Sequence, residues 1–145
     1  MKQSQTLSSI QPLIGPFNIL DSQDGVDATL NINCLTTGRW ILSLYYWDLD
    51  ELPGKASTTR SIAAALNRSA GHSDALGPTN LEAFQFHRNY PAPFASTCVS
   101  CEYEGPMVEI RAANGNVLAY RKPCDSIEQA TKDAESICQA LNIRA

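Results

Sequence analysis

One stretch decides the fold class of this 145-residue chain: Met107-Val-Glu-Ile-Arg-Ala-Ala-Asn-Gly-Asn-Val-Leu-Ala-Tyr-Arg-Lys122. Two runs of alternating apolar side chains flank Asn114-Gly115. An Asn-Gly pair in this setting is the strongest short-range signal for a β-hairpin, because a tight hairpin turn needs positive φ at both of its central residues. With a two-residue loop, the predicted core face consists of Val108, Ile110, Ala112, Val117 and Ala119, with Arg121 at its edge.

The sequence after this hairpin predicts a long amphipathic helix. Ser126 with Gln129, and Asp125 with Glu128, have the spacing of a helix-capping box. The apolar positions that follow recur at intervals of three and four, and they are Ile127, Ala130, Ala134, Ile137, Cys138 and Leu141. We predict that this stripe packs the helix onto the sheet.

Two further strands are predicted on either side of the turn Thr37-Gly38. Residues 28–34 alternate between apolar and polar side chains, whereas residues 39–47 are apolar on both faces. A two-residue loop would set Ile41 opposite Cys34 and Tyr45 opposite Leu30 on the buried face. The other face would then carry Trp40, Leu42, Leu44 and Tyr46. A strand that is apolar on both faces is either central in its sheet or used for binding.

The other segments give weaker signals. Ser57 or Thr58 can cap a helix that runs to Ser69, with a stripe formed by Ile62, Ala65, Leu66 and Ser69. Residues 97–104 alternate as a strand does, residues 21–27 form a turn, and residues 1–20 are expected to be an arm or an irregular entry segment. Residues 81–88 fit a helix capped by Thr79 or Asn80, or a strand, and both alternatives stay open.

These elements predict a single α+β domain over residues 1–145, with an antiparallel sheet of five to six strands and two main helices. Both Ala65-Leu66-Asn67 and Ala140-Leu141-Asn142 end a helix that follows a hairpin. This order fits a duplicated ββα unit. Because the match is short, we favour independent recurrence of a common supersecondary unit.

Composition and charge exclude several classes of protein. The chain is 43% hydrophobic, with 11 basic and 15 acidic side chains and a net charge of −4. It is too apolar to be disordered, and its acidic balance does not favour attraction to nucleic acid or to an anionic membrane. Its N-terminal residues lack the unbroken apolar run of a secretory signal, and no segment has the length of a membrane span. We therefore expect a cytoplasmic protein.

The five cysteines do not predict a metal site. Cys98-Val-Ser-Cys101 has the C-x-x-C spacing, and the further zinc ligands available to it are Cys34, Cys124, His72 and His87. If residues 97–104 form a strand, however, Cys98 and Cys101 point to opposite faces and cannot share a metal ion. We expect no metal and no other cofactor.

Two rival functions stay open. A small metal-dependent enzyme could use the carboxylates of Asp48-Leu-Asp50-Glu51, or the cysteines and histidines as a zinc or thiol site. A nucleic-acid-binding module could use the basic helix at residues 55–72, which carries Lys55, Arg60 and Arg68 and no acid. No catalytic motif for nucleophilic or phosphoryl-transfer chemistry is present, so the balance is against an enzyme.

An acidic-aromatic edge is the leading candidate for a functional site. Both Trp residues and two of the five Tyr residues fall between positions 40 and 47, directly before the acidic turn. Tyr and Trp are enriched at binding hot spots, and carboxylates beside them suit a basic protein surface. The predicted partner-binding residues are Tyr45, Tyr46, Trp47, Asp48, Asp50 and Glu51. We therefore expect a non-enzymatic, inhibitor- or immunity-like protein that binds another protein, with a homodimer as an open alternative.

Overall fold

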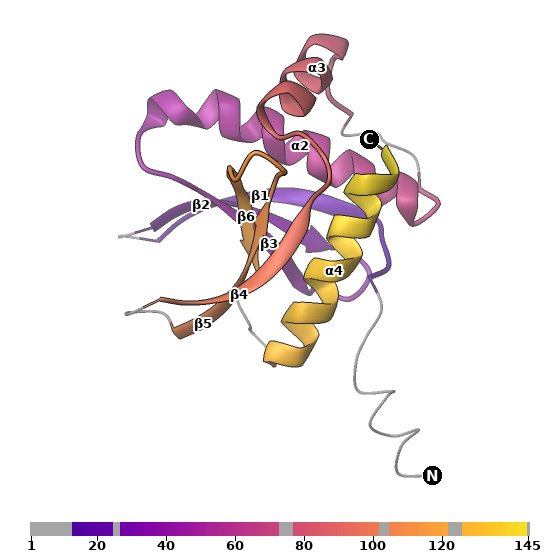
Figure 1. Cartoon of the computed structure of the whole chain (residues 1–145). Helices are drawn as coiled ribbons and strands as arrows, with labels where there is room; N and C mark the ends of the chain where they lie inside the picture. The colour runs from indigo at the N-terminus through magenta and orange to yellow at the C-terminus, as the bar shows by residue number, and fades with distance from the viewer. Residues whose placement is uncertain (1–12, 25–26, 73–76, 102–104, 122–125, 145) are drawn as a thin grey trace.

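The computed structural model describes residues 13–24, 27–72, 77–101, 105–121 and 126–144, and one antiparallel sheet of six strands runs through it (Figure 1). The strands are β1 (Phe17–Asp24), β2 (Asp27–Cys34), β3 (Trp40–Tyr46), β4 (Ala95–Cys101), β5 (Gly105–Arg111) and β6 (Val117–Arg121). A short 3-10 turn η1 (Leu49–Glu51) leads into α2 (Leu52–Ser69), and α3 (Asn80–Asn89) and α4 (Ile127–Arg144) complete the fold. The predicted α+β class, the antiparallel sheet and its two main helices are confirmed, and α3 is a third, shorter helix.

The order of the strands divides the sheet into two halves of equal make-up. Across the sheet the order is β1-β2-β3-β6-β5-β4, so each half consists of three consecutive strands followed by a long helix. The halves meet at the centre, where Ser43 of β3 pairs with Tyr120 of β6. The repeating unit in the structure is thus βββα, one strand longer than the expected ββα unit. A common origin of the two halves stays a prediction.

One contact recurs at equivalent places in the two halves. The Asn67 side chain, near the end of α2, accepts a hydrogen bond from Phe17 N and donates one to Phe17 O, at 2.8 and 3.2 Å. The Asn142 side chain, near the end of α4, forms the same two bonds with Phe94, at 2.7 and 3.1 Å. Each asparagine thereby ties a helix end to the start of the first strand of its own half.

The two long helices pack on one face of the sheet and enclose the core with it (Figure 1). The predicted helical stripes are buried there, including Ile62 and Leu66 of α2 and Ile137 and Leu141 of α4. Ser69, which we placed in the α2 stripe, is exposed. Among the described residues, no helix packs on the opposite face of the sheet, which is called the open face below.

The predicted register between β2 and β3 is wrong by one residue. Leu30 pairs with Leu44 and Ile32 with Leu42. The connection from Cys34 to Arg39 contains four residues instead of two, which alone shifts the register by two residues, and the irregularity between Ile32 and Asn33 takes back one residue of that shift. A shift of one residue turns every side chain of a strand to the other face of its sheet. Leu42 and Leu44 therefore belong to the core, and Tyr45 lies on the open face.

The hairpin of β5 and β6 has the predicted register away from its turn. Val108 pairs with Arg121, and Ile110 with Ala119. Close to the turn the register shifts, because the loop has three residues and ends on Gly115, whose φ is +89°. Val117 therefore pairs with Arg111 on the open face, and its predicted place on the core face is wrong.

Two boundaries differ from those predicted, and one open alternative is resolved. Helix α2 begins at Leu52 instead of near Ser57, because Pro53 fits the first turn of a helix, where no backbone N–H is needed. Phe17–Asp24 is a regular strand, where an arm was expected up to residue 20 and a turn over residues 21–27, while residues 1–12 and 25–26 lie outside the described residues. Residues 81–88 are helical, and Thr79 and Glu82 form the capping box that starts α3.

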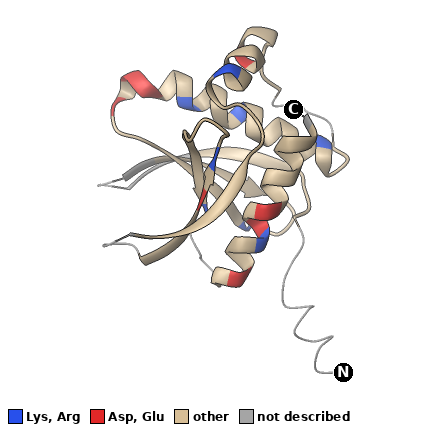
Figure 2. Ribbon diagram, in the orientation of Figure 1, with Lys and Arg blue, Asp and Glu red and all other residues tan. Residues whose placement is uncertain are grey.

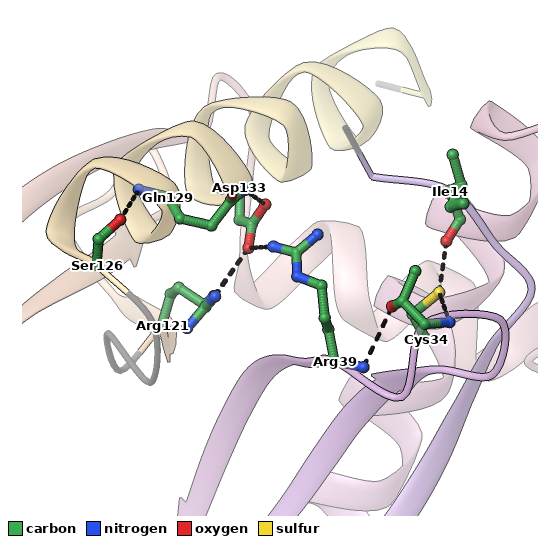
Figure 3. A network of polar contacts seen from close by, with 8 residues as sticks. Ile14, Cys34, Arg39, Arg121, Ser126, Gln129 and Asp133 are labelled. Carbon is green, nitrogen blue, oxygen red and sulfur yellow. Dashed lines mark hydrogen bonds and ion pairs between the residues drawn. The ribbon is translucent and has the colours of Figure 1, made fainter. Parts of the chain in front are cut away.

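A buried cluster of polar side chains anchors α4 to the sheet (Figure 3). Arg121 donates from Nε and Nη2 to Oδ2 of Asp133, at 3.0 and 2.9 Å, and both side chains are 1% exposed. Arg39, from the loop before β3, donates to the same carboxylate, and Gln129 donates to its other oxygen at 2.9 Å. The positive charge of Arg121, which the hairpin places on the core face, is therefore balanced by the carboxylate of Asp133.

Candidate functional site

The open face carries a polar row that crosses the centre of the sheet. Strand register places Asn31, Ser43, Tyr120, Glu109 and Thr97 side by side on five adjacent strands. Three of them are almost fully buried, although no described helix covers this face: Ser43 is 1% exposed, and Asn31 and Glu109 are 6% exposed. Their burial comes from the large aromatic side chains beside them on the same face.

These aromatic side chains fix the polar row and cover it. Trp40 donates from Nε1 to Ser43 Oγ at 2.8 Å, and Ser43 donates to Asn31 Oδ1 at 3.0 Å. The Tyr45 ring lies edge-on to the Tyr120 ring, with centroids 5.7 Å apart. Because β3 and β6 are the central pair of the sheet, the aromatic cluster lies at the middle of the open face.

Trp47 extends this cluster beyond the end of β3. Its ring stacks on Tyr45 with centroids 6.3 Å apart and an angle of 14° between the ring planes. Its backbone N–H donates to Glu51 Oε1 at 2.9 Å, so the acidic turn holds the residue in place. The side chain is nevertheless 76% exposed, and Leu49 next to it is 71% exposed. Trp47 is therefore an ordered aromatic side chain that presents most of its surface to solvent.

A groove of about 530 Å³ lies beside the aromatic cluster. Tyr45, Trp47 and Tyr120 line it together with apolar side chains from three strands, which are Val99, Met107 and Val117. Glu109 and Lys55 are the charged residues of its lining. The Glu109 carboxylate is 8% exposed and forms an ion pair with Arg111, whose Nη1 also donates to Gly115 O at 3.1 Å. The groove thus combines aromatic walls with one carboxylate held in a fixed position.

The structure brings together some of the predicted site residues and separates others. Tyr45 and Trp47 lie side by side on the open face, and Asp48 and Asp50 are exposed in the turn that follows. Tyr46 alternates with Tyr45, so it lies on the helix-covered side and is 2% exposed. Figure 2 shows acidic residues gathered where the chain enters α2, whereas α2 itself contains no acidic residue.

Sequence reasoning did not place Glu109, Tyr120 and Trp40 in this site. Glu109 and Tyr120 join it only because β6 pairs with β3, which is a contact between distant parts of the chain. Trp40 was placed on the face opposite to Tyr45 because strict alternation was assumed, and the irregularity between Ile32 and Asn33 interrupts that alternation near Trp40. The Asn-Gly hairpin did carry a signal, since Glu109 and Arg111 alternate in sequence with its predicted core residues.

The cysteines do not form a metal site in the described part of the chain, where no three His, Cys, Asp or Glu side chains are placed to hold an ion. Cys98 lies on a strand, as predicted, and its sulfur is 3.8 Å from Thr131 Oγ1 of α4. Cys34 is buried and donates to Ile14 O at 2.8 Å. Burial raises the pKa of the Cys138 thiol to about 11. The Cys101 side chain and Cys124 lie outside the described residues.

Among the basic side chains of α2, Arg60 takes part in a contact within the protein. Arg60 forms an ion pair with Glu82 of α3. The Thr79 backbone N–H and the Arg60 guanidinium, both hydrogen-bonded to that carboxylate, hold the pKa of Glu82 below its ordinary value. A nucleic-acid phosphate at this helix would have to compete with Glu82 for Arg60.

Comparison with protein-family models, with curated proteins and with solved structures finds no match for this chain. Within the described residues, no helix combines the length and the apolar character that crossing a membrane requires.

Proposed function

We propose that this chain is a non-enzymatic binding protein that docks another protein on its acidic-aromatic edge, in the manner of small inhibitors and immunity proteins. The observation that carries the proposal is the exposure of Trp47 together with its contacts. The side chain is 76% exposed, yet its ring stacks on Tyr45 and its backbone N–H donates to Glu51. Hot spots of protein interfaces are enriched in Trp and Tyr, and an ordered side chain loses little conformational freedom on binding.

The surroundings of Trp47 indicate the kind of partner. Asp48 and Asp50 are exposed beside it, and Leu49 adds exposed apolar surface between them. This arrangement matches the general anatomy of an interface, with apolar anchors inside a charged rim. The carboxylates favour a basic surface on the partner, and a side chain of that partner can enter the groove between Trp47 and Glu109.

Affinity capture from the native host, followed by mass spectrometry, tests the proposal when three forms of the chain are compared. The variants are Trp47→Ala and, as a matched control, Phe84→Ala on α3, where Phe84 is 62% exposed. We expect the wild-type chain and the control to retain the same partner and Trp47→Ala to lose it. With the purified partner, Trp47→Ala should raise Kd about 30-fold, which is the ~2 kcal/mol typical of a hot spot.

Retention of the same partner by Trp47→Ala, with an unchanged Kd, would show that the interface lies elsewhere on the chain. Circular dichroism of the two variants serves as the check on folding. Because both substituted side chains are largely exposed, neither change removes a contact of the core.

A further inference from the structure

Strand β4 forms one edge of the sheet and lacks the features that protect sheet edges in monomeric proteins. In the part of the chain that the structure describes, it pairs with β5 alone. Its seven residues, Ala95-Ser-Thr-Cys-Val-Ser-Cys101, include no charged residue and no proline. Its register with β5 is continuous from Ala95 to Cys101 without a bulge. Natural proteins discourage pairing at such edges with charges, proline, bulges or covering segments.

The surroundings of β4 leave this edge accessible. Helix α4 packs on β4 with Thr131 next to Cys98, yet Thr97, Cys98 and Ser100 are all exposed. The exposed residues of α4 carry both signs of charge, with Lys132 3.7 Å from Glu135. Among the described residues of α4, charges of a single sign therefore do not oppose the approach of a second copy. The sequence of the other edge strand, β1, contains two aspartates, whereas that of β4 contains no charged residue.

We propose that β4 pairs with β4 of a second copy of this chain, antiparallel and about a two-fold axis at Cys98. This register pairs all seven residues of each strand. It sets Thr97 opposite Val99 of the second copy and Ser96 opposite Ser100, so that small or β-branched side chains meet and no like charges face each other. Both open faces then lie on the same side of one continuous sheet.

A second copy explains this edge better than an unrelated strand does. Pairing about a two-fold axis uses the free edge of both copies and closes the assembly. Pairing of β4 with β1 of another copy would leave one free edge at each end and would propagate into a filament. The sequences of the two edge strands agree with the closed arrangement. Charged residues, which discourage pairing at a sheet edge, occur in β1 and not in β4.

Light scattering after size-exclusion chromatography, over a wide series of concentrations, tests the proposal directly. We expect twice the mass of one chain at high concentration and the mass of one chain on dilution. Cys98→Lys and Cys98→Glu each place two like charges directly opposite each other, which is unfavourable in a sheet. Each variant should raise the dimer dissociation constant several-fold, whereas Leu20→Lys on β1, where the side chain is 48% exposed, should leave it unchanged.

An equal mixture of Cys98→Lys and Cys98→Glu distinguishes this register from other modes of association. Lysine then faces glutamate across the axis, so the mixture should form a heterodimer where each variant alone does not. A wild-type chain that stays monomeric throughout overturns the proposal, and so does a dimer that is indifferent to Cys98→Lys. Failure of the mixture to restore the dimer rejects an axis at Cys98.

Chemical cross-linking gives a second measurement that leaves β4 uncharged. In a variant with Cys101→Ser and Cys124→Ser, a short bismaleimide should join two chains through Cys98, because opposed residues of paired strands have Cβ atoms only about 5 Å apart. Peptide mapping identifies the linked residue. If the chain is dimeric at the concentration used for cross-linking and yet no Cys98–Cys98 product forms, the proposal is wrong.

Discussion

The Asn67 side chain satisfies both polar groups of the Phe17 backbone, accepting from its N–H and donating to its carbonyl oxygen. Asn67 is 3% exposed, and Phe17, which begins β1, is 3% exposed as well. Buried backbone groups at the start of an edge strand need such partners, because water cannot reach them. Asn142 provides the same two bonds to Phe94, but its own side chain is exposed.

Replacement of each asparagine by alanine should therefore have unequal effects on stability. Asn67→Ala leaves two buried backbone groups without partners and should lower the free energy of unfolding by about 2–4 kcal/mol. Asn142→Ala admits water to the Phe94 backbone and should cost about 1 kcal/mol or less. Urea unfolding of both variants measures the difference. Equal costs would contradict the importance that we assign to burial at Phe17.

The order of the elements could be predicted from the sequence because it depends on local patterns. The Asn-Gly pair defined the β5–β6 hairpin, and Ser126 was correctly placed at the start of α4, where its Oγ accepts from Gln129 N at 3.0 Å. Helix α3 was ambiguous, because Phe84 and Phe86 alternate as in a strand. In the structure this segment is a helix, and the capping box of Thr79 and Glu82 stabilises its first turn.

The open face could not be predicted, since it depends on register and on pairing between distant segments. The longer loop between Cys34 and Arg39, together with the irregularity between Ile32 and Asn33, reversed the faces predicted for β3. The pairing of Ser43 with Tyr120 joins the two halves and brings Tyr120 to Tyr45, and no local pattern encodes that contact. The Arg121–Asp133 pair was missed for the same reason, although Arg121 was already placed at the edge of the core face.

That buried ion pair leads to a second prediction about stability. Asp133→Ala leaves the Arg121 guanidinium buried without its counter-charge, and it should cost about 3–5 kcal/mol. Joint replacement by Arg121→Met and Asp133→Leu removes both buried charges and should cost less than the single change. Lys132→Ala breaks an exposed ion pair and is the control, with an expected cost within about 0.5 kcal/mol. Denaturant unfolding measures all three, and a double variant that is less stable than Asp133→Ala would contradict this account.

The capping of α3 should make the stability of the protein depend on pH through Glu82. Its pKa in the folded chain lies below the ordinary value of 4.5, because the Thr79 backbone N–H and Arg60 favour the carboxylate. The folded state thus holds this proton less readily than the unfolded chain does. The stabilisation is complete above that ordinary pKa and is lost as the pH falls through the lower, folded value.

Glu82→Gln keeps the capping geometry but removes the charge, so it isolates this effect. The variant should unfold at a lower temperature than the wild type at neutral pH, and the two melting temperatures should converge well below pH 4.5. Thermal unfolding followed by circular dichroism over this range provides the measurement. A difference that is the same at every pH would mean that the carboxylate charge of Glu82 adds nothing to the cap.

The acidic turn should affect the rate of partner binding more than the lifetime of the complex. Asp48→Asn with Asp50→Asn removes two exposed charges beside Trp47, while Glu51 stays because it holds the Trp47 backbone. The partner to use is the one that the wild-type chain captures and Trp47→Ala loses. The double variant should associate with it several-fold more slowly at low ionic strength, and the association rate should lose part of its salt dependence. Glu128→Gln with Glu135→Gln makes the same change in net charge on α4 and should have a smaller effect. Stopped-flow or surface-plasmon measurements over a salt series compare the two, and equal slowing by both double variants would assign the effect to net charge instead of to this edge.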